Sequence, residues 1–369
     1  MMQRRSLIKT GVAASLGGAG YSSFAQAQVT LKFHTFMSPQ SNVWLNMHKA
    51  WMDKVEKDSG GRIKFEAFPA MQLGGTPVQL YDQARDGVAD ITWTLPGNTA
   101  GRFPRVEVFE LPFMMSNAEA TSKAYWEYVQ TVAQDEFKEV VPLALQVHGP
   151  GVIHTVDKQI KTVADLKGLK MRAPTRQVNK LMGFLGATPV GMPLPAIPDA
   201  LSKGTINGCV IPWEVVPSVK VHELTKFHAE FDPKGGALYT TTFVMGMNRN
   251  KYNSLPADLK RVIDENAGLN ASAFLGRTQQ AGDPAGRKSA SDRPGNTIFT
   301  VDIAEAQAFR RASRLVEVEW VEDMNKRGFN GYKLLESARG LIEKHTKVAA
   351  APAPAAPAKA PMKAPAKKA

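Results

Sequence analysis

The chain has 369 residues, 43% of them hydrophobic and 22% charged, which is typical of a globular protein large enough for two domains. Its formal net charge is +12, but eight of the Lys and Arg residues stand in the first 27 residues and from Lys347 onward. Without those eight charges the remainder carries +4, and no basic stripe with a nucleic-acid reading element is present. These numbers exclude a nucleic-acid-binding class. The single cysteine, Cys209, excludes an internal disulfide.

The first segment, residues 1–27, has the features of an export signal. Arg4 and Arg5 precede a mildly apolar run, and Ala25–Ala27 forms a small-residue cleavage site. The run is short and rich in glycine, which argues against the alternative of an uncleaved membrane anchor. The paired arginines resemble a twin-arginine signal. We therefore expect periplasmic export with cleavage near Ala27.

From Gln28 the pattern alternates between strands and helices. The spacing predicts strands over 29–36, 62–68 and 88–95, with Leu31 and Phe33 on one face of the first. Helices are expected over 41–61 and 76–87, the second beginning at Pro77 and ending at Gly87. Strands separated by helices at this spacing indicate parallel pairing with right-handed crossovers.

The alternating pattern restarts near residue 143. Strands are expected over 143–155, 169–173, 187–194, 205–213 and 238–248, and helical segments over 175–186, 196–204, 256–286 and 304–328. The sequence thus predicts an α/β fold with two lobes and a ligand cleft between them. Lobe I is expected to comprise 28–150 and about 240–275. Lobe II is expected to comprise 151–239 and about 276–346, which includes bracing and C-terminal helices, and 347–369 is expected to be a disordered Ala/Pro/Lys tail.

Motifs for catalysis or cofactor binding are missing. The sequence has no GxSxG, no HExxH, no phosphate loop and no paired cysteines. The seven histidines have no metal-ligand spacing, and His222 and His228 are expected at the surface or at helix ends. Cys209 lies in an apolar strand and is expected to be a buried hydrophobic residue. We therefore expect no enzyme activity, no cofactor and no metal.

Arg172 stands at the carboxyl end of a short predicted strand, two residues before Pro174. A surface salt bridge is the ordinary role of such an arginine, whereas a position at the carboxyl end of a strand suits a two-pronged hold on a carboxylate. Trp93 and Trp213 stand at strand ends in opposite lobes. Each could be a core residue, but together with Arg172 they indicate an apolar cleft with one charged anchor.

Seven segments carry a family resemblance: "SGGRIKFEAFPAMQLG", "DGVADITW", "GRFPRVEVFELPF", "TVADLKGLKMRAPT", "LGATPVGMPLP", "ALSKGTINGCVIPWE" and "MNRNKYNSLPADLK". In this order they resemble the solute-binding proteins of tripartite ATP-independent periplasmic (TRAP) transporters, the DctP family. The resemblance implies a two-lobed extracytoplasmic receptor with mixed sheets and a long bracing helix. It implies that the lobes close on an organic carboxylate, which is passed to integral-membrane permease subunits. In "LKGLKMRAP", Arg172 falls on the arginine that grips the ligand's carboxylate in this family.

The chain departs from the sialic-acid-binding members of that family. Val152 stands where those members have a second arginine, and Ile211 stands where they have an asparagine. With fewer polar groups in the pocket, the hydroxyls of a sugar acid would lack hydrogen-bond partners. We therefore expect a hydroxy- or 2-oxo-monocarboxylate with an apolar or aromatic body, of mandelate or benzoylformate type. Glu214 could accept from a ligand hydroxyl or amine, or form a loop salt bridge. The expected lining is Phe36, Trp93, Leu95, Leu194, Ile211, Trp213, Glu214 and Phe243.

Two alternatives stay open at this point. One is an exported enzyme acting on an organic acid, which turnover of an acid would reveal. The other is a ligand receptor for a signalling partner rather than for a permease.

Overall fold

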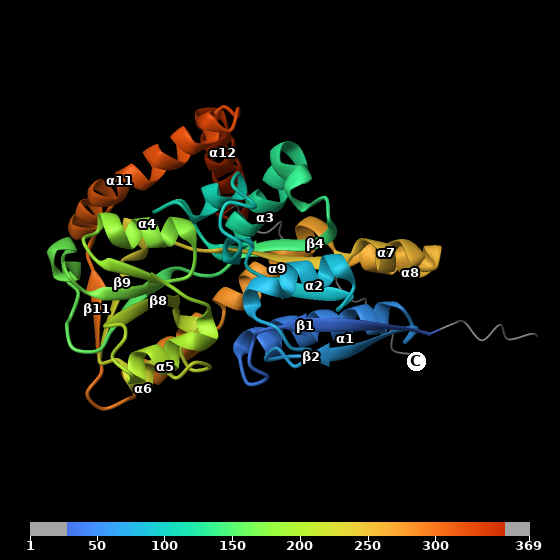
Figure 1. Cartoon of the computed structure of the whole chain (residues 1–369), viewed down its shortest axis with the longest axis horizontal. Coiled ribbons are helices and arrows are strands. Elements are labelled where there is room, and N and C mark those ends of the chain that lie inside the picture. The colour runs from blue at the N-terminus through green and yellow to red at the C-terminus, as the bar shows by residue number, and fades with distance from the viewer. Residues whose placement is uncertain (1–27, 351–369) are drawn as a thin grey trace, which may run out of the picture.

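The computed structural model describes residues 28–350, so the expected export signal and nearly all of the expected tail lie outside the described residues. The described chain forms two mixed β-sheets, each flanked by helices, in two lobes that lie side by side (Figure 1). This is the two-lobed α/β architecture expected from the alternating pattern. None of the described helices combines the length and apolarity needed to cross a membrane.

The first sheet has the strand order β2-β1-β3-β10-β4. β1 pairs in parallel with both β2 and β3, as predicted, whereas β10 is antiparallel to its neighbours β3 and β4. Leu31 and Phe33 are fully buried on one face of β1. The bounds are β1 Val29–Thr35, β2 Ile63–Phe68, β3 Ile91–Thr94, β4 Val140–Val147 and β10 Thr242–Asn248.

The second sheet has the order β11-β9-β5-β8-β6-β7. β6 is parallel to β7 and β8, and β5 is antiparallel to β8 and β9. The bounds are β5 Gly151–Thr155, β6 Lys170–Ala173, β7 Thr188–Gly191, β8 Gly208–Pro212, β9 Phe227–Phe231 and β11 Thr297–Val301. The strands before residue 149 together with β10 form one sheet and the others form the second, while the residue boundaries of the lobes stay a prediction.

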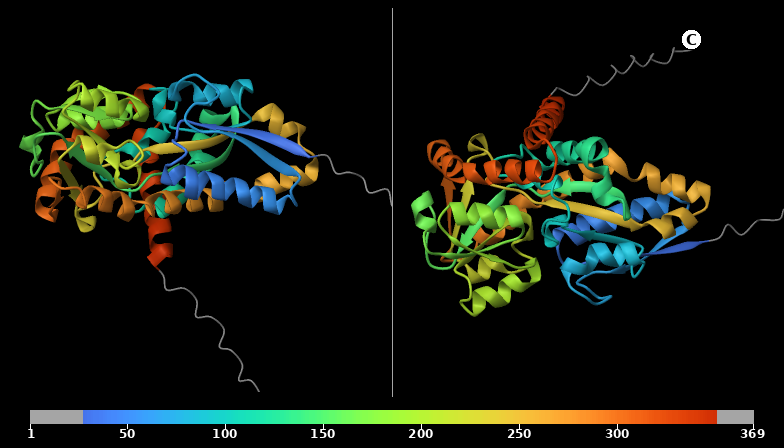
Figure 2. Two further views of the ribbon diagram at one scale, coloured as in Figure 1. Left: turned by 90° about the horizontal axis from the view of Figure 1, so that it is seen from below. Right: turned by 45° about the horizontal axis from the view of Figure 1, so that its top comes forward.

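Helices of moderate length cover the sheets (Figures 1 and 2). The predicted helix over 41–61 begins as a π-helix, η1 Val43–His48, and continues as α1 Lys49–Asp58. Gly87 ends α2 with a φ of 78°, a left-handed conformation that glycine adopts without strain. The other helices are α2 Leu80–Asp86, α3 Ala118–Tyr128, α4 Arg176–Phe184, α5 Ile197–Ser202, α6 Val221–Leu224, α7 Arg249–Ser254, α8 Ala257–Glu265, α9 Gly268–Gln280, α10 Asp283–Ser291, α11 Ile303–Lys326 and α12 Gly331–Ala350.

Consecutive helices α9 and α10 join the two lobes. α9 packs on β4 of the first sheet, and α10 packs on the 3-10 turn η9, Trp213–Val215, which follows β8 of the second sheet. The contact is close because α10 has a glycine at the meeting point: a Cβ on Gly286 would lie 1.9 Å from the Trp213 carbonyl oxygen. This segment is the brace that the family resemblance implied.

Candidate functional site

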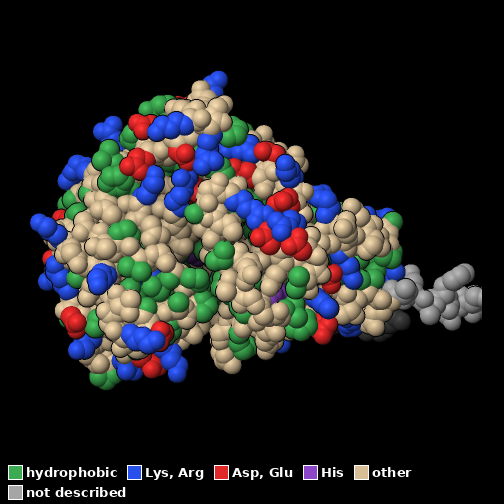
Figure 3. All heavy atoms as spheres, in the orientation of Figure 1, with side chains coloured by type: hydrophobic (Ala, Val, Ile, Leu, Met, Phe, Trp, Pro, Cys, Tyr) green, Lys and Arg blue, Asp and Glu red, His purple; other side chains and the backbone are tan. Residues whose placement is uncertain are grey.

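A cavity lies between the lobes, at the edges of both sheets. Its walls come from the residues that follow β1, β3, β4, β6 and β8 and from the start of the antiparallel strand β10. Its empty volume is about 510 Å³, open solvent included. Apolar side chains gather beside the hollow between the lobes, while charged side chains are spread over the outer surface (Figure 3).

Arg172 is buried in this cavity wall at the end of β6, with 3% of its surface exposed. Its Nε donates to the Met192 carbonyl at 2.9 Å, and its Nη1 donates to the Val210 carbonyl at 3.2 Å. No carboxylate of the described residues lies within salt-bridge distance of it, and burial lowers its pKa. A buried cation without a protein counter-ion has a large desolvation penalty, and an anionic ligand would offset that penalty.

Tyr239 and His148 line the cavity together with Arg172, and the positive charge of Arg172 acts to lower the pKa of both. The ring of Tyr239 lies against the backbone of Gly151, where a Cβ would come within 1.9 Å of Cε1, and its hydroxyl has no partner among the described residues. Burial raises the pKa of Tyr239, so it stays a hydrogen-bond donor. Burial and, to a lesser extent, the positive charge of Arg172 lower the pKa of His148 to about 4, which leaves this imidazole neutral.

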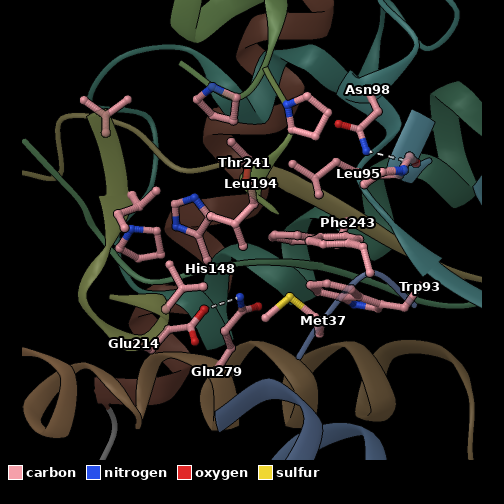
Figure 4. A pocket seen from close by; sticks show the side chains of 18 of the residues that line it. Met37, Trp93, Leu95, Asn98, His148, Leu194, Glu214, Thr241, Phe243 and Gln279 are labelled. Atoms are coloured by element: carbon pink, nitrogen blue, oxygen red, sulfur yellow. Dashed lines mark hydrogen bonds between the residues drawn. The ribbon is translucent and has the colours of Figure 1, made fainter. Parts of the chain in front are cut away.

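The opposite wall is aromatic. The rings of Trp93 and Phe243 stack with centroids 4.3 Å apart and 9° between their planes, and Phe36 stacks on Trp93 at 5.5 Å (Figure 4 shows Trp93 and Phe243). The Trp93 indole donates to Gln146 Oε1 at 3.1 Å, which fixes the plane of the ring. Flat faces of this kind suit a planar apolar ligand body, which stacks on them with little loss of conformational freedom.

A second pair of polar residues meets at the cavity wall beside α9. Gln279 donates through Nε2 to Glu214 Oε1 at 2.7 Å, whereas Glu214 Oε2 has no partner among the described residues (Figure 4). Burial is the largest cause that raises the pKa of Glu214 to about 8, and the neighbouring Asp283 adds to the shift. At neutral pH this carboxyl group is therefore largely protonated.

Most residues expected at the site line the cavity. They are Phe36, Trp93, Leu95, Arg172, Leu194, Ile211, Glu214 and Phe243. Sequence reasoning missed several other lining residues, namely Met37, Asn98, His148, Tyr239, Thr241 and Gln279. The position of Tyr239 near the start of the strand expected over 238–248 was the available signal for that residue. Gln279 lies on a helix and carried no such signal.

Trp213, also expected at the site, is not among the residues that line this cavity, and a contact between it and the ligand stays a prediction. Its indole donates to Glu230 Oε2 at 2.9 Å, and its ring packs edge-on against His154. The strand end was correctly located, but the side chain lies within the second lobe because Glu230 and the histidines provide polar partners there.

Two other expectations concern reactive residues. Cys209 is fully buried, and burial raises its pKa to about 12, which makes it an inert core residue as expected. His228 is fully buried with its Nδ1 2.8 Å from Nδ1 of His154, so the surface or capping role expected for it is wrong. No group of three or more potential metal ligands occurs among the described residues.

Comparison with known proteins adds independent findings. A structure from Rhodoferax ferrireducens, a TRAP solute-binding protein in complex with copurified benzoate, is 72% identical, with a TM-score of 0.87 over 88% of this chain and 100% of that one. A marine metagenome protein described as specific for aromatic acid ligands, in complex with 3-hydroxybenzoate, is 48% identical, with a TM-score of 0.84 over 86% of this chain and 99% of that one.

A third solved structure is more distant. It is a TRAP solute-binding protein from Bordetella bronchiseptica with bound (R)- and (S)-mandelate, 27% identical, with a TM-score of 0.78 over 86% of this chain and 99% of that one. The DctP family model, described as bacterial extracellular solute-binding protein, family 7, matches residues 33–323. Since that match covers more than half of the chain, the protein belongs to the DctP family of bacterial extracellular solute-binding proteins.

Proposed function

We propose that this protein is the extracytoplasmic receptor of a TRAP transporter and that its ligand is an aromatic monocarboxylate. One observation carries the proposal: Arg172 is buried in the wall of a cavity that aromatic residues also line, with no acidic partner among the described residues. The described residues therefore leave this charge without a counter-ion. A ligand with one carboxylate and a flat apolar body supplies the counter-ion and fills the space next to the rings.

The carboxylate is assigned to Arg172 and Tyr239. Since Nε and Nη1 of Arg172 are held by carbonyl oxygens, the guanidinium is oriented before the ligand arrives, and its Nη2 is left to donate. Tyr239 contributes a hydroxyl that has no other partner among the described residues. Donors that are oriented in advance lower the entropy cost of binding, and charge-assisted bonds in a dehydrated site are strong.

The ligands of the relatives support the same substrate class. Benzoate, 3-hydroxybenzoate and mandelate are all monocarboxylates with a benzene ring. The largely apolar lining here, with Ile211 in the cavity wall and Val152 paired with it on β5, disfavours sugar acids because several hydroxyls would lose their hydrogen bonds. A hydroxy- or 2-oxo-acid with an aromatic body, as expected from the sequence, falls within this class.

Delivery and location form the rest of the proposal. The signal-like segment before Gln28 supports export to the periplasm by the twin-arginine route and cleavage near Ala27. The receptor then passes its ligand to integral-membrane permease subunits and performs no chemistry on it. Family membership supports this role in transport.

Two measurements test the proposal. Mass spectrometry of the solution released by denaturing purified protein should identify an aromatic acid at close to one equivalent per chain. A thermal-shift screen of organic acids should give its largest response with benzoate-type acids. A response confined to sugar acids or dicarboxylates would refute the substrate class, and steady turnover of an acid would favour the enzyme alternative.

A further inference from the structure

A chain of four buried side chains runs from the aromatic wall to Glu214. Trp93 Nε1 donates to Gln146 Oε1 at 3.1 Å, Gln146 Nε2 donates to Gln279 Oε1 at 2.9 Å, and Gln279 Nε2 donates to Glu214 Oε1 at 2.7 Å. The four side chains come from β3, β4, α9 and η9, and none has more than 4% of its surface exposed. This series of hydrogen-bonded side chains therefore connects both sheets through the bracing helix.

The direction of these hydrogen bonds is set at one end. An indole N–H can only donate, so Gln146 must accept with its oxygen and donate with its nitrogen. The same constraint then applies to Gln279, and Glu214 Oε1 must accept. The remaining oxygen of Glu214, Oε2, is buried without a partner in the described part of the chain. A buried polar atom without a hydrogen-bond partner destabilises the folded state unless a ligand or water binds it.

Glu214 and Arg172 occupy different parts of the cavity wall. The charge of Arg172 lowers the pKa of His148, Cys209 and Tyr239, whereas the charged group that shifts Glu214 is Asp283. The two lining residues also form no ion pair with each other in the described structure. A ligand held at its carboxylate by Arg172 thus presents another part of its body to Glu214.

We infer that Glu214, oriented by Gln146 and Gln279, is a specificity-determining residue that binds a hydroxyl group on the ring of the aromatic acid. This inference rests on the proposed function and names the ligand more closely. A hydroxyl both donates and accepts, so it satisfies a carboxyl group in either protonation state. A second carboxylate on the ligand would be buried without a counter-ion, because Arg172 neutralises only the first.

The decisive comparison is between benzoate, 3-hydroxybenzoate, 4-hydroxybenzoate and 3-methoxybenzoate, measured by calorimetry on the wild-type protein. We expect one hydroxybenzoate to bind about tenfold or more tightly than benzoate. At pH 9, where Glu214 is ionised and its Oε2 can only accept, the methoxy compound should lack this gain, because its oxygen cannot donate. In Glu214→Met the preference should fall to less than about threefold, while Glu214→Gln, which keeps a polar group, should retain most of it.

Three outcomes are distinguishable. Equal affinities for benzoate and both hydroxybenzoates in the wild type would overturn the role of Glu214, even though aromatic acids bind. An unchanged preference in folded Glu214→Met would overturn it as well. Absence of binding by all four acids would refute the proposed function itself. The wild-type comparison decides the inference even if the methionine variant does not fold.

Discussion

The backbone amide of Glu214 donates a hydrogen bond of 3.0 Å to Oδ1 of Asp283, which places the buried carboxyl group of Glu214 next to the half-buried one of Asp283. Burial raises the pKa of Asp283 to about 7 and that of Glu214 to about 8. Both acids sit where α10 packs on η9, and the brace between the lobes therefore contains two groups that resist ionisation.

The stability of the ligand-free protein should fall as the pH rises through this region. Both folded-state pKa values lie above the unfolded values, so the folded state binds more protons, and stability is lost between about pH 4 and pH 8. The loss is on the order of 4 to 5 kcal/mol for each group taken alone. Urea unfolding at pH 5 and pH 8.5 should show it, and Glu214→Gln with Asp283→Asn should remove most of it. A difference between the two pH values that survives in the double variant would contradict the assignment.

Tyr239→Phe should weaken binding without weakening the fold. The hydroxyl has no partner among the described residues, so its removal leaves nothing unpaired in the empty protein. We expect about a tenfold loss of affinity for benzoate, the usual effect of one hydrogen bond to a charged group. Tyr81→Phe is a matched control, because Tyr81 is also buried with an unpartnered hydroxyl but does not line the cavity. Equal affinity changes in the two variants would argue against a role for Tyr239.

Gly286→Ala should disturb the brace. The added Cβ would meet the Trp213 carbonyl oxygen at 1.9 Å and its carbon at 2.5 Å, both backbone atoms that cannot turn aside. We expect a loss of about 1 to 3 kcal/mol of stability together with weaker ligand binding, because η9 carries Glu214. Gly340→Ala in α12 is the control: nothing lies within 4 Å of that position, and alanine should stabilise the helix slightly. Circular dichroism melts of both variants provide the measurement.

Much of the fold was predictable because its local patterns are strong. The buried alternation in β1 and the end of α2 at Gly87 were read correctly from neighbouring residues alone. Pro77 begins a 3-10 turn, Pro77–Gln79, that leads into α2, so the helix proper starts three residues later than expected. β9 was not predicted, since its residues His228 and Glu230 are polar and are accommodated by partners far along the chain, His154 and Arg287. Helices α3 and α12 were not predicted either.

The residues of the candidate site were likewise predictable only in part. Residues at strand ends, such as Arg172 and Trp93, were predictable because the carboxyl ends of strands converge on a cleft. Strand position could not show which way an indole points, and the Trp213 indole bonds to Glu230 within the second lobe. Gln146 and Gln279 are 133 residues apart in sequence, and only the folded chain reveals their hydrogen bond.

Replacement of Arg172 should separate binding from stability. Arg172→Met removes a buried charge that has no carboxylate partner in the described structure, so the free energy of unfolding of the empty protein should stay the same or rise. Affinity for an aromatic acid should fall by several kcal/mol, about 3 or more, because the ligand's carboxylate would then be buried unpaired. The affinity of Arg172→Lys should lie between those of the wild type and Arg172→Met, since lysine keeps the charge and loses the planar fork.

Arg176, four residues further along the chain, is the matched control with the opposite expectation. It contacts Glu107 and Asp323, the latter at 3.0 Å, and it does not line the cavity. Arg176→Met should lower stability, because the buried Glu107 loses its cation, and it should leave affinity nearly unchanged. Chemical unfolding and calorimetry on both variants supply the comparison. If Arg172→Met lowered stability as much as Arg176→Met and kept its affinity, Arg172 would be a structural residue and the ligand's carboxylate would bind elsewhere.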